Sequence, residues 1–461
     1  MNDTACETVT GGDVKVGKLA ASLGGRLCTI PLSQIEVADR FREDYGNLNE
    51  LALSLSTMGQ LQNLVVCIQE NEEFPYRLLA GGRRFKTMTE KLEWTEARAL
   101  VFERELSVLE MLEVEWEENC RRKDLDWKED CALKAQIQKL RIEQFGQRTG
   151  DMKSGTSIRQ TAAELGVSPA TMSEDVKLAR AVEVVPQLFE GCRTKKEAKK
   201  VLKLATEQMM RAEKSAAIMQ NVGQESKLQS LLDRYILNDF FAGIQNVPDK
   251  SVDFVEIDPP YAINLREVKR LKDTRYSLDS YNEVAVEDYL AFITACIKES
   301  YRIMNDNTFG ILWHAPDPWH EHFKNILRDN GFETTGLTGK WTKPTGQCMQ
   351  PSKYLANACE EFFYFWKGSP SIVRQGRTNV FQYVPVPAAR KVHPTERPIE
   401  LIQEILSTFC WEHSRICVPF LGSGKTILAA ETLKMKAFGF ELAASYKDAY
   451  TILAQEMFGG Q

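Results

Sequence analysis

Residues 251–261 read Ser-Val-Asp-Phe-Val-Glu-Ile-Asp-Pro-Pro-Tyr, and this stretch decides how the rest of the chain is interpreted. Its first seven residues are rich in β-branched and aromatic side chains, which predicts a buried strand. The last four, Asp258-Pro259-Pro260-Tyr261, then lie at the carboxyl end of that strand, the edge at which open α/β sheets bind ligands. We therefore expect a carboxylate, two backbone carbonyls and an aromatic ring at this binding edge. The two prolines add no N–H groups there, because proline has none.

This tetrapeptide suits methylation of an exocyclic amino group on a base. An aromatic amine is a poor nucleophile because its lone pair is delocalised into the ring. Asp258 and the Pro259 carbonyl would accept its two hydrogens and favour an attacking geometry, while Tyr261 would stack on a base extruded from the duplex. A proline turn that closes a strand, with Asp258 as a turn residue, explains the same letters. The tetrapeptide alone leaves both interpretations open.

The composition is that of a soluble globular protein in a reducing compartment. The 461 residues suggest about three domains, and the net charge of −6 means that any nucleic acid is bound through local basic patches. Eleven cysteines without a CxxC pair, and the lack of a signal peptide, predict a cytoplasmic protein. No apolar run is long enough to span a membrane. Cys410, His413 and Cys417 resemble a metal pattern but lack a fourth ligand, so we predict core residues, with a metal site as the alternative.

The texture of the sequence changes along the chain and predicts five segments. In the last segment, strands and helices alternate, which predicts an α/β fold with a Rossmann-like, doubly wound sheet. Residues 335–358 are polar and are expected to be irregular, and the variable stretch 335–390 to contact the target. The segments are a flexible arm (1–27), a small α+β domain (28–118), a helical domain (119–185), a basic helical connector (186–229) and the α/β domain (230–461).

A glycine turn near the end of the chain predicts a nucleoside site. The strand Arg415–Val418 leads into Pro419-Phe420-Leu421-Gly422-Ser423-Gly424-Lys425-Thr426 and a helix. The ending resembles a phosphate-binding P-loop, but Pro419 stands where that loop needs its first glycine, and only 35 residues follow Thr426. A close-approach loop for an adenosyl cofactor fits better. Glu441 follows at a strand end, about twenty residues on, where it can accept both hydroxyls of a ribose.

With both motifs in place, residues 230–461 resemble DNA amino-methyltransferases of the beta class, in which DPPY precedes the FxGxG cofactor loop. Val418 departs from the family's usual aspartate and Lys425 from its usual threonine, which keeps an inert DNA-binding protein as an alternative. The resemblance implies catalytic roles for Asp258, Pro259, Pro260 and Tyr261, and S-adenosylmethionine contacts for Asp239, Phe420, Gly422, Ser423, Gly424, Glu441, His393, Thr395 and Arg397.

Two arginine-containing clusters mark the amino-terminal half. Gly82-Arg83-Arg84 opens a helix directly after a strand, where backbone N–H groups and guanidinium groups form an anion site. With a second cluster at 117–125, residues 28–180 resemble ParB-type partition proteins with their ParB/sulfiredoxin-like domain, although Asn63 stands where that family usually has proline. The resemblance implies cytidine triphosphate as a second ligand, and DNA contact by the same arginines is the plainer alternative. The residues concerned are Gly82, Arg83, Arg84, Glu118, Asn119 and Arg122.

Residues 157–173 have the pattern of a helix-turn-helix. Gly166 permits the turn, and Ser168 caps a second helix that has proline at its first position. Ser168, Thr171 and Ser173 would face a major groove. The basic stretch 193–214 fits a helix on the phosphate backbone, or equally a solvated linker.

The function predicted from these motifs is site-specific methylation of the 6-amino group of adenine in double-stranded DNA. The 4-amino group of cytosine is the nearest alternative, because the geometry of attack is shared. An inert, ParB-like regulatory protein is the alternative from another class. A restriction-modification setting and a homodimer are both compatible with the sequence.

Overall fold

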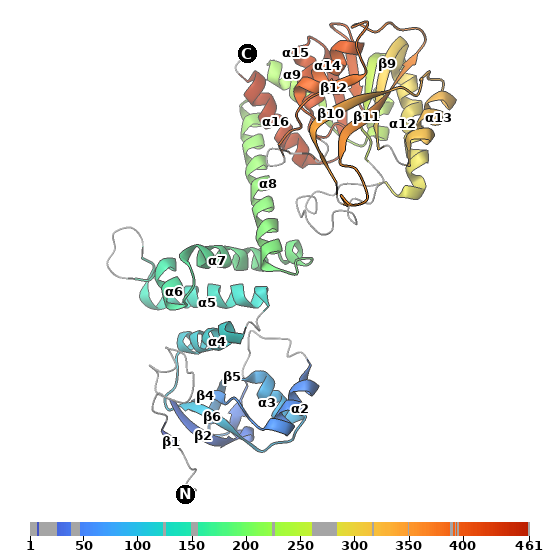
Figure 1. The fold of residues 1–461 in the computed structure, drawn as a ribbon. Helices are drawn as coiled ribbons and strands as arrows, with labels where there is room; N and C mark the ends of the chain where they lie inside the picture. Colours follow the sequence, from blue (N-terminus) through green and yellow to red (C-terminus); the bar gives the residue numbers. More distant parts are fainter. Residues whose placement is uncertain are drawn as a thin grey trace. The chain divides into compact units, whose positions relative to one another are not determined.

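The computed structural model describes residues 7–8, 25–37, 47–122, 126–148, 155–223, 226–260, 284–315, 318–348, 350–387, 391, 393 and 396–459. The chain divides into two compact units, residues 1–202 and 203–461 (Figure 1). Within the described part of the chain, no helix combines the length and the apolar character needed to cross a membrane.

The first unit begins with a six-stranded mixed sheet in the order β1-β2-β6-β4-β5-β3. Helices α2 and α3 pack beside it, and Leu55 and Met88 from these helices join Leu64, Val66 and Val101 from the strands in one core cluster. The elements are β1 (Glu7–Thr8), β2 (Gly25–Pro31), η1 (Leu32–Gln34), β3 (Ile35–Glu36), α2 (Leu48–Met58), β4 (Leu64–Ile68), β5 (Tyr76–Ala80), α3 (Gly82–Glu90) and β6 (Glu96–Phe102).

The rest of the first unit is helical. The turn between α6 and α7 forms as the sequence indicates, because Gly166 adopts a φ of 69° and the Ser168 side chain accepts a hydrogen bond from the Thr171 N–H. Helix α8 runs without a break across the boundary at Leu202. The elements are α4 (Val108–Arg122), α5 (Trp127–Phe145), α6 (Ile158–Glu164), α7 (Pro169–Val184), η2 (Pro186–Phe189) and α8 (Lys195–Asn221).

The second unit contains an eight-stranded sheet in the order β12-β10-β11-β9-β8-β13-β14-β7. Strands β9, β8, β13, β14 and β7 are parallel, and β11 and β10 extend the sheet by antiparallel pairing. The strands are β7 (Tyr235–Leu237), β8 (Val252–Ile257), β9 (Met304–His314), β10 (Thr338–Gln347), β11 (Asn357–Lys367), β12 (Val380–Gln382), β13 (Arg415–Val418) and β14 (Lys436–Glu441).

Helices cover both faces of this sheet, which confirms the doubly wound α/β fold (Figure 1). Successive side chains of β8 point to opposite faces: Phe254 packs in the cluster with α9, α14, α15 and α16, whereas Val255 and Ile257 pack in the cluster with α10, α12 and α13. The helices are α9 (Lys227–Asp233), α10 (Phe240–Gly243), η3 (Ile244–Asn246), η5 (Val286–Asp288), α12 (Tyr289–Ile303), α13 (His320–Asp329), α14 (Ile399–Phe409), α15 (Lys425–Thr432) and α16 (Ala444–Phe458).

One structural expectation is wrong in part. Residues 335–358 were expected to be irregular, but β10 occupies Thr338–Gln347. The sequence of β10 is rich in Gly, Lys and Thr, and the strand forms because it pairs with β11, with Trp341 opposite Glu360 and fully buried. Long-range pairing has overridden weak local propensity here.

Candidate active site

The Asp258 segment lies where the central strand of the second unit ends. Strand β8 is flanked by β9 and β13, and both neighbours run parallel to it. Asp258 and Pro260 are half-buried, and Pro259 is buried. Tyr261 lies outside the described residues. The carboxylate and the proline carbonyls are therefore held at the carboxyl edge of the sheet, as the sequence predicts for a ligand-binding edge.

The glycine turn connects β13 to α15 and reaches the same edge. Gly422 and Gly424 have φ values of 53° and 71°, a conformation that favours glycine. A Cβ at Gly424 would meet the ring of Tyr450 at 2.4 Å and that of Tyr235 at 2.9 Å. The Tyr235 hydroxyl also donates to the Gly422 carbonyl at 2.6 Å. The backbone of the turn is thus pressed against two buried rings, with no room for a side chain at position 424.

Glu441, at the end of β14, is tied to this turn by its backbone partners. Its carboxylate accepts hydrogen bonds from the N–H groups of Gly422 at 2.9 Å, and of Leu442 and Ala443 at 3.0 Å each. Three N–H donors fix the orientation of an ionised carboxylate. A carboxylate fixed beside a glycine turn is an acceptor for a ligand with hydroxyl groups.

A cavity of about 350 Å³ lies between these segments, within the size range of small-molecule sites. The structure therefore brings together the Asp258 segment and the glycine turn, which are far apart in the sequence. Gly424 starts helix α15 beside the cavity, and Thr395 lies outside the described residues. The predicted site residues that line the cavity are Asp239, Asp258, Pro259, Pro260, His393, Arg397, Phe420, Gly422, Ser423 and Glu441.

Arg397 has a partner that the sequence did not indicate. Its two terminal nitrogens, Nη1 and Nη2, donate to the two oxygens of the Asp258 carboxylate at 2.5 and 3.2 Å, and Nη2 also donates to Glu360 at 3.2 Å. It also lies 3.7 Å above the ring of Trp313. A planar cation held by a carboxylate fork and an aromatic face has one orientation. Arg397 therefore orients Asp258. No local sequence pattern could indicate this pair, because the two residues are 139 positions apart.

Glu256 is a second residue that sequence reasoning missed. Its buried carboxyl accepts from the hydroxyl of Thr426 at 2.7 Å and from the Trp313 indole at 3.2 Å. Burial raises the pKa of this carboxyl. The Thr426 bond joins the strand that carries Asp258 to the helix that follows the glycine turn, so the two halves of the cavity are fixed together.

Lys425, at the lysine position of the P-loop-like ending, pairs with a carboxylate. Its ammonium group contacts the carboxylate of Glu396 at 2.7 Å, and Glu396 is buried. Near it, the ring of His393 packs against Tyr446 with a centroid distance of 4.6 Å. Burial lowers the pKa of His393 to about 4, so this imidazole is neutral at physiological pH.

In the first unit, both predicted arginines contact backbone carbonyls. Gly82 opens α3 after Gly81, which has a φ of 95°. Arg84 is buried and donates to the Asn63 carbonyl at 2.7 Å, and Arg83 donates to the Asn47 carbonyl at 3.2 Å. The side chains of Glu118, Asn119 and Arg122 lie outside the described residues, so the second half of this predicted anion site stays a prediction.

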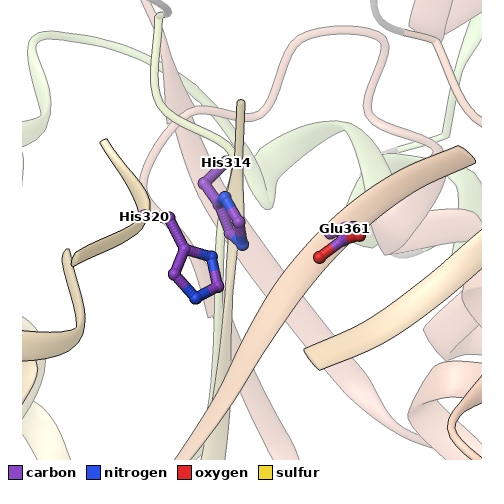
Figure 2. A group of neighbouring side chains, drawn as sticks. All are labelled: His314, His320 and Glu361. Atoms are coloured by element: carbon purple, nitrogen blue, oxygen red, sulfur yellow. The ribbon is translucent and has the colours of Figure 1, made fainter. Parts of the chain in front are cut away.

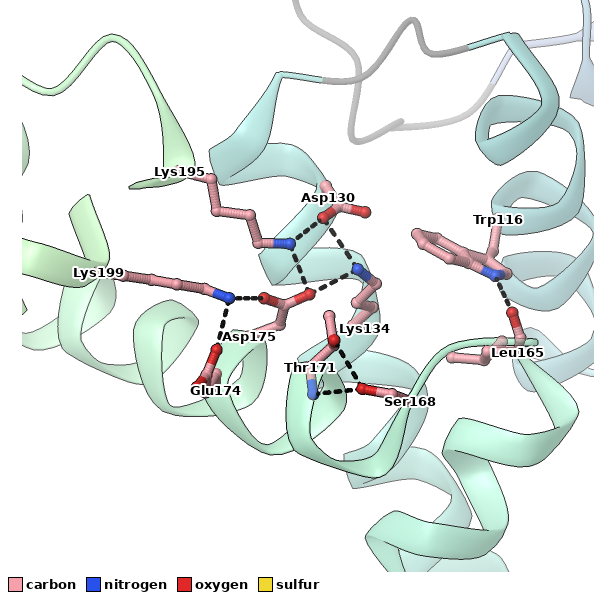
Figure 3. Close-up of polar contacts among 10 residues, drawn as sticks. All are labelled: Trp116, Asp130, Lys134, Leu165, Ser168, Thr171, Glu174, Asp175, Lys195 and Lys199. Atoms are coloured by element: carbon pink, nitrogen blue, oxygen red, sulfur yellow. Dashed lines mark hydrogen bonds and ion pairs between the residues drawn. The ribbon is translucent and has the colours of Figure 1, made fainter. Parts of the chain in front are cut away.

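The helix-turn-helix is fixed by polar contacts behind its second helix (Figure 3). The buried Asp175 on α7 accepts from Lys134 of α5 at 2.6 Å and from Lys195 of α8 at 2.5 Å. Ser168 is exposed at the start of α7, and its hydroxyl lies 2.8 Å from that of Thr171. Thr171 and Ser173 are half-buried. The groove contacts of these three residues stay a prediction.

The cysteine and histidine pattern near the end of the chain does not converge. Cys410 and Cys417 belong to the two core clusters on opposite faces of the sheet. His413 is exposed. The two cysteines are core residues as predicted, whereas the prediction is wrong for His413, which lies at the surface in the turn between α14 and β13.

Comparison with known proteins separates the chain into two parts. A family model described as a DNA methylase matches residues 252–453, and the model of the ParB N-terminal domain matches residues 20–120. The putative methylase YubD of Escherichia coli is 23% identical over 223 residues, which are 47% of this chain and 88% of that protein.

Two further proteins resemble one part each. The nucleoid occlusion protein of Bacillus cytotoxicus is 26% identical over 185 residues, 39% of this chain, and the chain spans 57% of the length of that relative. The structure titled M1.HpyAVI-SAM complex matches 47% of this chain and 97% of its own, at 19% identity and a TM-score of 0.36. The chain thus joins an amino-terminal segment that matches the ParB N-terminal domain to a carboxy-terminal segment that matches the DNA methylase family.

Proposed function

We propose that the second unit transfers a methyl group from S-adenosylmethionine to the 6-amino group of adenine in double-stranded DNA. The observation that carries this proposal is the shared cavity of Asp258 and the glycine turn. A methyl donor and an amino acceptor must lie within reach of each other at one site. In this sheet, the acceptor segment and the nucleoside-type turn end at the same edge.

The residues around the cavity fit an adenosyl cofactor. The turn at Gly422 allows close approach of a ligand to the backbone, and Glu441 offers an oriented carboxylate to a ribose. Phe420 is half-buried against Phe240 and Phe292 and supplies an apolar wall. When bound, the cofactor would supply an electrophilic methyl group. These side chains would bind it and hold it in place.

Asp258 and the Pro259 carbonyl would accept the hydrogens of the target amine. Arg397 holds the carboxylate in one orientation through two hydrogen bonds, so the acceptor needs no reorganisation when the base arrives. The adenine assignment follows from the resemblance of the motifs and their order. The 4-amino group of cytosine would present the same two hydrogens and is the alternative that the experiment below separates.

The first unit would bring the enzyme to DNA in the cytoplasm. Its support is the ParB N-terminal match and the capped helix-turn-helix, whose second helix begins at an exposed serine. We infer that helix α7 contacts the major groove and that Arg83 and Arg84 belong to an anion site for DNA phosphate or for cytidine triphosphate.

The test is transfer of radiolabelled methyl groups from S-adenosylmethionine to unmethylated genomic DNA by the full chain. Digestion of the product to nucleosides identifies the modified base, and we expect N6-methyladenine. Asp258→Ala should reduce transfer at least about 100-fold, as expected when an oriented acceptor is lost. Asp329→Ala removes an exposed aspartate of α13 and is the matched control.

The outcomes divide the alternatives. N4-methylcytosine in the digest would replace the adenine assignment and keep the site. If the wild-type chain and Asp258→Ala are equally silent while both still bind DNA, the methyltransferase proposal fails, and the inert regulatory protein stands.

A further inference from the structure

Three potential metal ligands meet on the face of the sheet opposite Arg397. His314 ends β9, His320 begins α13, and Glu361 lies on β11 directly across from His314. One ligand atom from each residue lies within 4.8 Å of the other two. Figure 2 shows the two imidazole rings and the carboxylate turned toward one another. No sequence motif indicates this group, because its members come from three separate elements.

The opposite face separates this group from the candidate active site. Along β9, Trp313 points toward Arg397, and the next residue, His314, therefore points to the other side. Along β11, Glu360 contacts Arg397 and Glu361 points away in the same manner. None of the three residues lines the cavity beside Asp258. The group is thus a separate site and needs a separate explanation.

His314 is held in the form that binds a metal. It is 4% exposed, and its Nδ1 lies 3.1 Å from the Ala315 carbonyl. Since a carbonyl only accepts, Nδ1 carries the proton and Nε2 carries the lone pair. Among the described residues, the buried Nε2 has no hydrogen-bond partner.

Glu361 is oriented by two polar partners. Its carboxylate accepts from the hydroxyl of Thr338 at 2.8 Å and from the ammonium of Lys340 at 3.1 Å. A carboxylate has about four lone-pair positions, and the side chain of Lys340 is 43% exposed and can turn into solvent.

We propose that His314, His320 and Glu361 bind one zinc ion and leave a fourth position open. Two imidazoles with one carboxylate form a ligand set typical of zinc sites that keep a water ligand. Magnesium and calcium prefer sites made of oxygen ligands. Tetrahedral bonds of about 2.0–2.2 Å require ligand atoms about 3.5 Å apart. The ligand atoms here lie within 4.8 Å of one another. Rotation of the half-exposed side chains of His320 and Glu361 can shorten these distances.

The surroundings resemble the outer shell of a metal site. Ligating histidines are usually oriented by a backbone carbonyl or carboxylate at the other ring nitrogen, and the Ala315 carbonyl has that position. Phe363 lies against both rings, at 4.6 Å from the centroid of His314 and 4.7 Å from that of His320. This ring forms an apolar wall. Bound zinc would link β9, β11 and the start of α13 at the edge of the sheet that carries Asp258.

The experiment measures metal binding by the full chain after removal of metal with a chelator. Zinc is titrated against a competing indicator, and cobalt(II) is used as a coloured probe. We expect one zinc per chain, and visible cobalt bands without a thiolate charge-transfer band. His320→Ala should bind zinc at least about 100-fold more weakly, because one of three ligands is lost. Glu361→Gln, which keeps the size of the side chain, should also weaken binding.

His322→Ala is the matched control, since His322 is an exposed histidine on the same helix. Zinc should raise the melting temperature of the wild type and of His322→Ala but not that of His320→Ala. The proposal is overturned if the stripped wild type binds no zinc at micromolar concentrations, or if His320→Ala binds it as tightly as His322→Ala does. A cobalt spectrum dominated by thiolate would also overturn it. None of these readouts depends on methyl transfer.

Discussion

Replacing Arg397 with methionine should separate the orientation of Asp258 from the stability of the fold. The substitution keeps an unbranched side chain over Trp313 but removes the two hydrogen bonds at 2.5 and 3.2 Å. Displacement of a reacting group by 1 Å costs roughly 100-fold in rate, or about 2.7 kcal/mol of activation free energy. We therefore expect kcat for methyl transfer to fall about 100-fold, with little change in the KM for the methyl donor.

The same substitution should also lower stability, so its control must share that effect. Loss of one partner from a buried ion pair costs about 3–5 kcal/mol, and the lower end applies because Asp258 is 16% exposed. Arg377→Met is the matched control. Arg377 also pairs with a carboxylate, Glu404 at 2.6 Å, and lies 3.7 Å above an aromatic ring, Phe381, but it does not line the cavity.

Single-turnover methyl transfer, corrected for the folded fraction from thermal melting, is the assay. Arg397→Met should transfer methyl groups roughly 100-fold more slowly than Arg377→Met. Arg397→Lys should recover part of the rate, because lysine restores the positive charge but not the paired hydrogen bonds of the guanidinium. Equal rates for the two methionine variants would show that Arg397 has only a structural role. A rate above that of the wild type would show that Arg397 blocks Asp258.

Two further substitutions test the glycine turn and His393. Gly424→Ala should lower the free energy of unfolding by about 2–5 kcal/mol, the sum of a left-handed backbone and overpacking against Tyr450. Gly376→Ala has a similar φ of 77° but no neighbour within 4 Å of its Cβ, and should lower it by only about 1–2 kcal/mol in denaturant titrations. Because the pKa of His393 is about 4 instead of 6.5, the folded chain binds fewer protons there than the unfolded chain. The contribution of His393 to the free energy of unfolding is therefore complete above pH 6.5. It is lost as the pH falls toward 4, by up to about 3 kcal/mol. His393→Gln should flatten the pH dependence of the free energy of unfolding between pH 4 and 6.5. His322→Gln, the control, should leave this dependence unchanged. An unchanged dependence for His393→Gln would refute the lowered pKa of His393.

The fold of the second unit was predictable because its strands have strong local patterns. The apolar run that ends at Ile257 and the run that ends at Val418 are both mostly buried parallel strands, as their composition indicates. Strand β10 was not predictable, since its residues are polar and its stability comes from pairing with β11. Register between distant strands has no local signature.

The same distinction applies to the site. Asp258, Gly422 and Glu441 belong to motifs with recognisable spacing, and all three line one cavity. The contacts of Arg397 with Asp258, of Thr426 with Glu256 and of His314 with Glu361 join residues with no fixed separation in the sequence. Motifs therefore identify the groups that act on a ligand, whereas the groups that hold them in place emerge only from the tertiary structure.

The position of β8 has a consequence for synthesis on the ribosome. This strand lies between β9, which is translated soon after it, and β13, which is translated only after β10, β11, β12 and α14. Contacts between such distant segments form late because the loop between them must close first. The first unit of a growing chain is thus exposed long before the cavity beside Asp258 exists. Every nascent molecule therefore passes through a stage in which no reaction can take place at that cavity.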